Sequence, residues 1–369
     1  MRPLALLLLA LLIGTGCHTV PPEPLVHLQR DDLELAIWPG GGGRAVSLRL
    51  AGGANILFAT AATGMQMPGH ADRDDGAVEV ARYSDDELVL IDDPRHDAHR
   101  GQGAPGPANG WAAYGGHVTW VAPQRAWWSR VSYRPPRERA PIWPPDPWTV
   151  FGAYAIVEQH PHSLVLIGPA SPITGLQLRK TYELLGDDRV RVSVVATNIG
   201  DAPVSWGLWS NTRLPAVARA FIPASPEAAT AADDGIAVAT INGLCFLDTR
   251  GARAGDSRKL STSPRLGLIA AFIGDRVFVK EWTVVAAEAV APGHAPVEIY
   301  QKVGDDDGIL ELEFHGAYRT LQPGEAMAIS EIWSLLRYDG QAAPTDQVRF
   351  LNSYIRDHYS NHADGEYDE

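Results

Sequence analysis

The pattern that most constrains this chain is a long series of short runs rich in valine, isoleucine, leucine, tryptophan and tyrosine. Glycine, proline, asparagine and aspartate separate these runs, and such residues favour tight turns. Short apolar or alternating runs between turn residues predict β-strands, and a helical period is almost absent before residue 341. The chain is therefore predicted to be all-β.

The runs also indicate how the strands pack. Residues 176–183 alternate between two faces, whereas residues 266–273 are apolar throughout, which predicts a strand covered on both faces by stacked layers. The predicted strands span residues 33–38, 44–50, 76–83, 88–91, 117–122, 153–158, 163–167, 176–184, 190–198, 204–209, 236–247, 266–273, 277–283, 297–303, 309–315 and 328–335.

The length of the chain allows either two domains or one large sandwich. Its 369 residues, 45% of them hydrophobic, exceed the roughly 250 to 300 residues at which single cores usually stop growing. We expect one sandwich domain over residues 30–340. Residues 341–369 are expected to form a C-terminal helix and an acidic tail, with Thr345 or Asp346 as the helix cap. The apolar stripe of this helix would comprise Val348, Leu351, Tyr354, Ile355 and Tyr359.

The first sixteen residues resemble a bacterial lipoprotein signal peptide. One arginine precedes an apolar run that is shorter than the roughly 20 residues needed to span a bilayer, and small residues lead to Cys17. We expect Cys17 to carry a lipid anchor and the proline-containing residues 17–29 to form a tether. Residue 18 is histidine, whereas an aspartate there resembles a signal for inner-membrane retention. The predicted location is the cell envelope, anchored in the outer membrane on its periplasmic side or surface.

The net charge of −13 excludes nucleic acid as the main partner, because phosphate binding needs clustered basic residues. Once Cys17 is lipidated, Cys245 remains alone, so neither a disulfide nor a cysteine metal site is available. Residues 92–99 and 305–307 lack the spacing of a zinc site or a calcium loop. No nucleotide or nucleophile-elbow motif occurs, so no metal and no cofactor is predicted.

Residues 101–148 hold six of the eleven tryptophans among many glycines and prolines. These indoles either fill the end of a sandwich or form an apolar surface on which a sugar ring stacks. The six are Trp111, Trp120, Trp127, Trp128, Trp143 and Trp148.

Several motifs in and after this segment resemble those of the DUF4380 family, whose members look like galactose mutarotase-type antiparallel β-supersandwiches. They are Gly110-Trp111, Tyr114-Gly115-Gly116-His117, Trp120-Val121-Ala122-Pro123-Gln124, Trp143-Pro144-Pro145-Asp146-Pro147, the segment 171–177, and the turns at 198–203 and 321–325. The early Gly42-Gly43-Arg44 strand and the late Pro-Gly-Glu turn are also shared with aldose 1-epimerases.

This resemblance implies a site on the concave face of the large sheet, with a late-strand glutamate as base and a mid-chain histidine as acid. Glu311 and Glu313 occupy the late strand and alternate in phase, so both point to one face. They are the candidate bases, and the competing interpretation is a solvated strand face. The strand after the turn at 198–203 contains no histidine, which leaves His117 or His315 as the candidate acid.

These observations support three hypotheses. The first is a lipoprotein that binds a mono- or oligosaccharide. The second is an aldose epimerase or related enzyme that uses Glu313 or Glu311 with His117 or His315. The third is a structural envelope protein whose sandwich binds other proteins. In the first, indoles stack on the sugar and polar side chains bond its hydroxyls, and the residues involved are Trp111, Trp120, Trp143, Trp209, Gln124, Asn211, Arg213 and Glu313.

Overall fold

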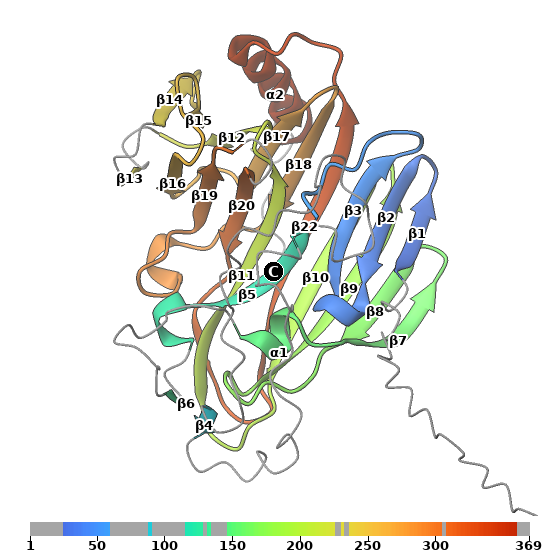
Figure 1. The fold of residues 1–369 in the computed structure, drawn as a ribbon, viewed down its shortest axis with the longest axis vertical. Coiled ribbons are helices and arrows are strands. Elements are labelled where there is room, and N and C mark those ends of the chain that lie inside the picture. The colour runs from blue at the N-terminus through green and yellow to red at the C-terminus, as the bar shows by residue number, and fades with distance from the viewer. Residues whose placement is uncertain are drawn as a thin grey trace, which may run out of the picture.

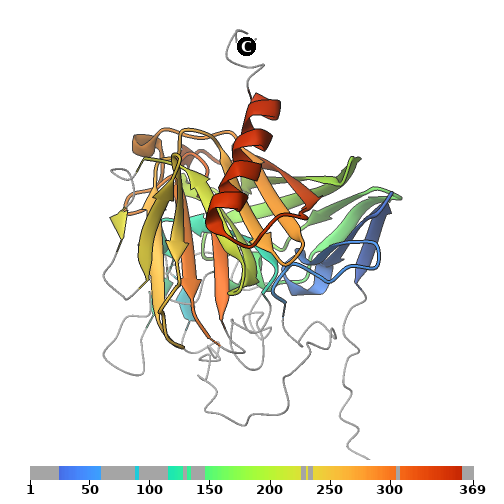
Figure 2. The same ribbon diagram turned by 90° about the horizontal axis from the view of Figure 1, so that it is seen from above.

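The fold consists of two large antiparallel sheets stacked face to face (Figures 1 and 2). The computed structural model describes residues 25–59, 88–90, 115–127, 131–133, 146–225, 230–231, 236–304 and 308–359. Trp111, Trp143, Cys17 and the predicted strand 76–83 lie outside these residues. In the described part of the chain, no helix is both long and apolar enough to cross a membrane.

The first sheet has its strands in the order β1-β2-β3-β5-β11-β20-β19-β16-β13, with β21 pairing on β11. Their bounds are β1 Val26–Arg30, β2 Leu33–Trp38, β3 Arg44–Leu50, β5 His117–Ala122, β11 Val204–Pro215, β13 Thr230–Ala231, β16 Ser257–Thr262, β19 Val297–Lys302, β20 Ile309–His315 and β21 Arg319–Leu321.

The second sheet has the order β14-β15-β12-β17-β18-β22-β10-β9-β8-β7. Its strands are β7 Ala155–His160, β8 Ser163–Ile167, β9 Leu176–Gly186, β10 Arg189–Asn198, β12 Arg219–Pro223, β14 Ala237–Ile241, β15 Leu244–Asp248, β17 Leu268–Ile273, β18 Arg276–Trp282 and β22 Ala326–Arg337. The strands β4 Leu88–Leu90 and β6 Val131–Tyr133 pair separately, and the helical elements are α1 Pro147–Val150, α2 Pro344–Tyr359, η1 Pro39–Gly41, η5 Gln124–Ala126 and η7 Ala287–Ala289.

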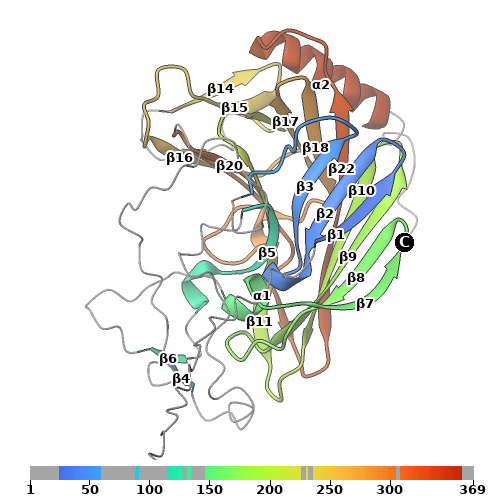
Figure 3. The ribbon, with the colours of Figure 1, turned by 45° about the vertical axis from the view of Figure 1, so that its right-hand side comes forward.

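The helix α2 packs on the outer face of the second sheet, at the end formed by β12, β15, β17 and β18 (Figure 3). Val348 and Leu351 pack there against Leu268 and Phe272 of β17, while Ile269 faces the main core between the sheets. Both faces of β17 are therefore covered, as its continuous apolar run predicts. The helix begins at Pro344, before the predicted caps, because proline is well accommodated in the first turn of a helix.

Three of the differences between the predicted and the observed strands change how the sheets are built. Residues 236–247 form a hairpin rather than one strand, because Asn242 and Gly243 both have positive φ and turn β14 back as β15. The strand predicted at 204–209 continues to Pro215, where the polar residues Asn211 and Arg213 are buried by neighbouring strands. Val26–Arg30 forms β1 in register with β2, so four residues assigned to the tether belong to the sheet.

Candidate functional site

The predicted glutamates lie at the centre of the first sheet, on neighbouring strands that share one face. Asn211 of β11 stands opposite Glu313 of β20, which stands opposite Glu298 of β19. Arg213 stands in the same way opposite Glu311, so the two glutamates share a face, as their alternation predicts. We call this the site face of the first sheet. The opposite face, carrying residues such as Leu312, packs on the second sheet.

A network of hydrogen bonds and ion pairs joins the carboxylates of the site face. Asn211 Nδ2 donates to Glu313 Oε1 over 2.8 Å, and Arg213 Nε donates to Glu311 Oε1 over 2.6 Å. Lys259 of β16 bridges two acids, with Nζ 3.0 Å from Glu313 Oε2 and 2.5 Å from Glu298 Oε2. The carboxylates are almost fully buried, and a buried charge is tolerated only with such partners.

The two acids held by Lys259 have opposite electrostatic environments. Burial raises the pKa of Glu313 well above its ordinary value, and Lys259 only partly offsets this effect. Burial also acts to raise the pKa of Glu298, but its contacts with His294, His315 and Lys259 outweigh burial and lower the pKa. Burial lowers the pKa of His315 to about 4. The site face therefore holds one carboxyl that resists ionisation beside one that favours it.

Three described indoles, those of Trp120, Trp127 and Trp209, pack against one another. Trp209 stacks on Trp127, at 6.0 Å between ring centroids and 28° between planes, and on His315, at 4.9 Å and 29°. Trp120 meets Trp209 edge to face at 4.8 Å. The Lys259 ammonium also lies 5.2 Å from the centroid of the Trp209 ring, and Trp120 and Trp209 are only 2 to 3% exposed. Among the described tryptophans, this arrangement fits a packed aromatic cluster better than a stacking platform for sugar.

His117 and His315 lie on opposite faces of the first sheet. His117 points to the inner face, where Nδ1 lies 2.9 Å from Thr212 Oγ1 and the ring packs on Trp333. His315 lies on the site face with Glu313. The structure therefore joins His315, and not His117, to the candidate glutamates. Gln124 lies beside this cluster in η5, where its backbone N–H reaches Nε2 of His294 at 3.2 Å.

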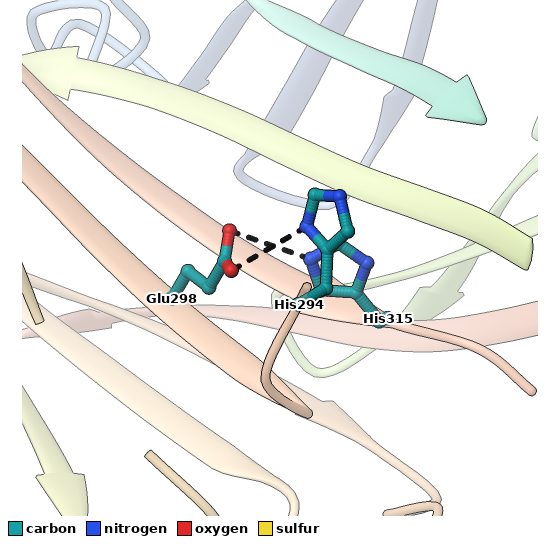
Figure 4. A group of neighbouring side chains, drawn as sticks. All are labelled: His294, Glu298 and His315. Atoms are coloured by element: carbon teal, nitrogen blue, oxygen red, sulfur yellow. Dashed lines mark ion pairs between the residues drawn. The ribbon is translucent and has the colours of Figure 1, made fainter. Parts of the chain in front are cut away.

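Sequence reasoning missed a cluster of His294, Glu298 and His315 (Figure 4). Glu298 Oε1 lies 3.4 Å from His294 Nδ1, and Glu298 Oε2 lies 3.5 Å from His315 Nε2. The only local signal is the four-residue spacing of His294 and Glu298, which runs from a loop into β19. His315 joins them solely through strand pairing.

These three residues supply the nitrogen and oxygen donors that suit a transition-metal ion. One contact opposes this role. The backbone N–H of Gln124 donates to Nε2 of His294 and therefore favours a proton on Nδ1, the atom that faces Glu298 and would bind the metal. A neutral hydrogen bond contributes about 1 kcal/mol net, whereas structural zinc sites have apparent binding free energies of about 10 to 16 kcal/mol. Loss of the Gln124 contact would therefore be outweighed by metal binding.

The sequence profile of the domain of unknown function DUF4380 matches residues 95–336, about two thirds of the chain. The chain belongs to the DUF4380 family. Its matched region includes β11, β19 and β20, the strands that carry Asn211, Glu298, Glu313 and His315. No curated protein matches this DUF4380 chain.

Solved structures that resemble this DUF4380 chain include a galactose mutarotase related enzyme from Lactobacillus acidophilus, at 7% identity and a TM-score of 0.48, with 87% of this chain and 100% of the other covered. Galactose mutarotase-like proteins from Lactobacillus casei and Clostridium acetobutylicum are each 10% identical, with TM-scores of 0.44 and 0.43. Each alignment covers 85% of this chain, together with 100% of the L. casei chain and 95% of the C. acetobutylicum chain. The chemistry of the site has to be judged from this chain's own residues.

Proposed function

We propose that this chain is a carbohydrate-binding protein of the cell envelope, anchored through Cys17, whose ligand binds the site face. The observation that carries the proposal is a concentration of buried polar atoms without a hydrogen bond in the described part of the chain. They include Asn211 Oδ1, Trp209 Nε1 and His315 Nδ1, all on the site face. Buried polar atoms are normally paired, so a ligand rich in hydroxyl groups would complete them.

The charges of the site face favour a neutral polyol over an anionic ligand. Arg213 is paired with Glu311, and Lys259 is held by Glu298 and Glu313. Amide, carboxyl and imidazole groups can both donate to and accept from sugar hydroxyls. Because the side chains are buried, we expect association slower than for an open surface site.

Tryptophan fluorescence tests this proposal, because Trp120 and Trp209 lie on the site face with Asn211 and Glu313. We expect saturable quenching by at least one member of a panel of mono- and oligosaccharides. Asn211→Leu should weaken binding at least tenfold, because it removes a polar group facing the ligand. Ser205→Ala is the matched control, since Ser205 is on the same strand but bonds Thr320 at the surface. Absence of binding to the whole panel at millimolar concentration would reject the proposal.

The second candidate function is an aldose epimerase, and the shared face of Glu313 and His315 favours it. In mutarotation a base takes the proton of the anomeric hydroxyl and an acid protonates the ring oxygen. The bond between the anomeric carbon and the ring oxygen breaks, a carbonyl forms, and the reverse steps close the ring. Polarimetry on several aldoses is decisive, because Glu313→Gln should lower a true rate by about 100-fold or more. If the wild type binds sugars but does not accelerate mutarotation, the epimerase function is rejected and only the binding function stands.

A further inference from the structure

We propose that His294, Glu298 and His315 form a binding site for one divalent transition-metal ion of the zinc class. The three donor atoms come from the loop before β19, from β19 and from β20, and all lie within 4.8 Å of one another. This proposal does not depend on a sugar being the ligand of the site face.

The distances within the cluster match metal ligation better than hydrogen bonding. Neighbouring ligand atoms of a tetrahedral zinc site, with bonds of about 2.0 to 2.1 Å, are about 3.3 Å apart. Here His294 Nδ1 lies 3.4 Å from Glu298 Oε1, and His315 Nε2 lies 3.5 Å from Glu298 Oε2, so each carboxylate oxygen faces one imidazole. A hydrogen bond between an imidazole and a carboxylate is shorter, about 2.7 to 2.9 Å when charged. The three ligand atoms lie within 4.8 Å of one another, so small side-chain shifts would bring them to ligation distance from one ion.

The donor set selects the class of metal. Two imidazole nitrogens and one carboxylate oxygen suit zinc, cobalt, nickel or ferrous iron, whereas calcium and magnesium prefer oxygen ligands alone. Three protein ligands also leave a fourth tetrahedral position for water or a ligand, as in catalytic zinc sites. His315 is 1% exposed and Glu298 is 4% exposed, so water competes little for these donors.

Lys259 modulates this site by its charge. Its ammonium lies 2.5 Å from Glu298 Oε2, the oxygen that faces His315, and it places a positive charge close to the cation. Removal of this charge should tighten metal binding, because the two cations repel each other across a poorly screened interior. A cluster that serves only as a structural hydrogen-bond network would not respond in this direction.

The test is a titration of the full chain with Zn²⁺ alone, after chelator treatment and without a histidine tag. We expect one equivalent to bind, with at least 100-fold weaker binding in Glu298→Gln and in His315→Gln. His160→Gln is the control, since His160 is an exposed histidine on β7, and its affinity should equal that of the wild type. Lys259→Met should bind about tenfold more tightly.

Thermal melting first establishes that each variant is folded. Titration of the wild type with Co²⁺ is a second measurement that needs no variant, and visible absorption typical of four-coordinate cobalt supports the site. Wild-type protein that binds less than a tenth of an equivalent at about 100 μM Zn²⁺ would overturn the proposal. Equal affinities in the wild type, Glu298→Gln and His315→Gln would also overturn it. Sugar binding is measured separately on metal-free protein, so either proposal can fail alone.

Discussion

Asn211 and Glu313 face each other across β11 and β20, and the amide of Asn211 donates a hydrogen bond of 2.8 Å to the buried carboxyl. This contact joins two residues 102 positions apart and fixes the centre of the site face. Its neighbour Lys259 holds the other oxygen of the same carboxyl. Stability measurements can therefore probe the site without knowledge of its ligand.

Replacement of Asn211 by leucine should destabilise the fold by about 2 kcal/mol, because a buried carboxyl loses its amide donor. Urea denaturation measures the change in the free energy of unfolding. Ser205→Ala, which breaks an exposed hydroxyl pair on the same strand, should cost less than about 0.5 kcal/mol. Equal costs for the two variants would mean that the Asn211 contact contributes nothing specific.

Lys280 ties the two sheets together directly behind the site face. Its ammonium donates to Ser210 Oγ and Thr212 Oγ1 of β11 and lies 3.2 Å from Glu331 of β22. Lys280→Met should cost about 3 kcal/mol, because the buried Glu331 loses its cationic partner and keeps only hydrogen bonds from Ser210 and Trp333. The double variant Lys280→Met with Glu331→Leu should recover much of this loss in chemical denaturation. A double variant less stable than Lys280→Met would contradict this account.

His117 should make the protein less stable in acid. Burial, with the charge of nearby Lys280, holds the pKa of His117 well below its ordinary value, and the ring faces Thr212 and Glu331. The unfolded state therefore binds the proton first as pH falls below about 6.5, so stability is complete above that pH and declines below it.

Between pH 7 and pH 5, the titration of His117 should lower the free energy of unfolding by up to about 2 kcal/mol. His117→Gln should remove it and flatten that part of the profile, whereas His160→Gln, at an exposed site on β7, should leave the profile unchanged. Free energies of unfolding at a series of pH values give the comparison. A profile of His117→Gln as steep as that of the wild type would show that other groups govern acid stability.

Cys17 should be the sole attachment of the chain to a membrane. One acyl chain binds membranes only marginally and two bind stably, and a mature lipoprotein carries at least two on its cysteine. Cys17→Ser should convert a membrane-fraction protein into an uncleaved precursor or a soluble one. Fractionation and mass spectrometry in a native host check this. If the wild-type protein is soluble and its Cys17 is unmodified, the lipoprotein interpretation is wrong and the first residues are a plain secretory signal.

The sequence by itself determined the properties that depend on near neighbours. Alternation along a pleated strand put Glu311 and Glu313 on one face, and the apolar run 266–273 indicated a doubly covered strand. The same alternation places His117 and Trp120 on opposite faces of β5. That signal was available in the sequence and argued against a shared site for these two residues.

Only the tertiary structure decided which strands meet. His294, Glu298 and His315 are brought together by the pairing of β19 with β20, and Asn211 reaches Glu313 through the pairing of β20 with β11. The same packing stacks Trp209 on Trp127 and on His315, a contact between distant segments that the tryptophan content of residues 101–148 does not reveal. Strand order and register depend on contacts between distant segments, and a local period of two carries no information about them.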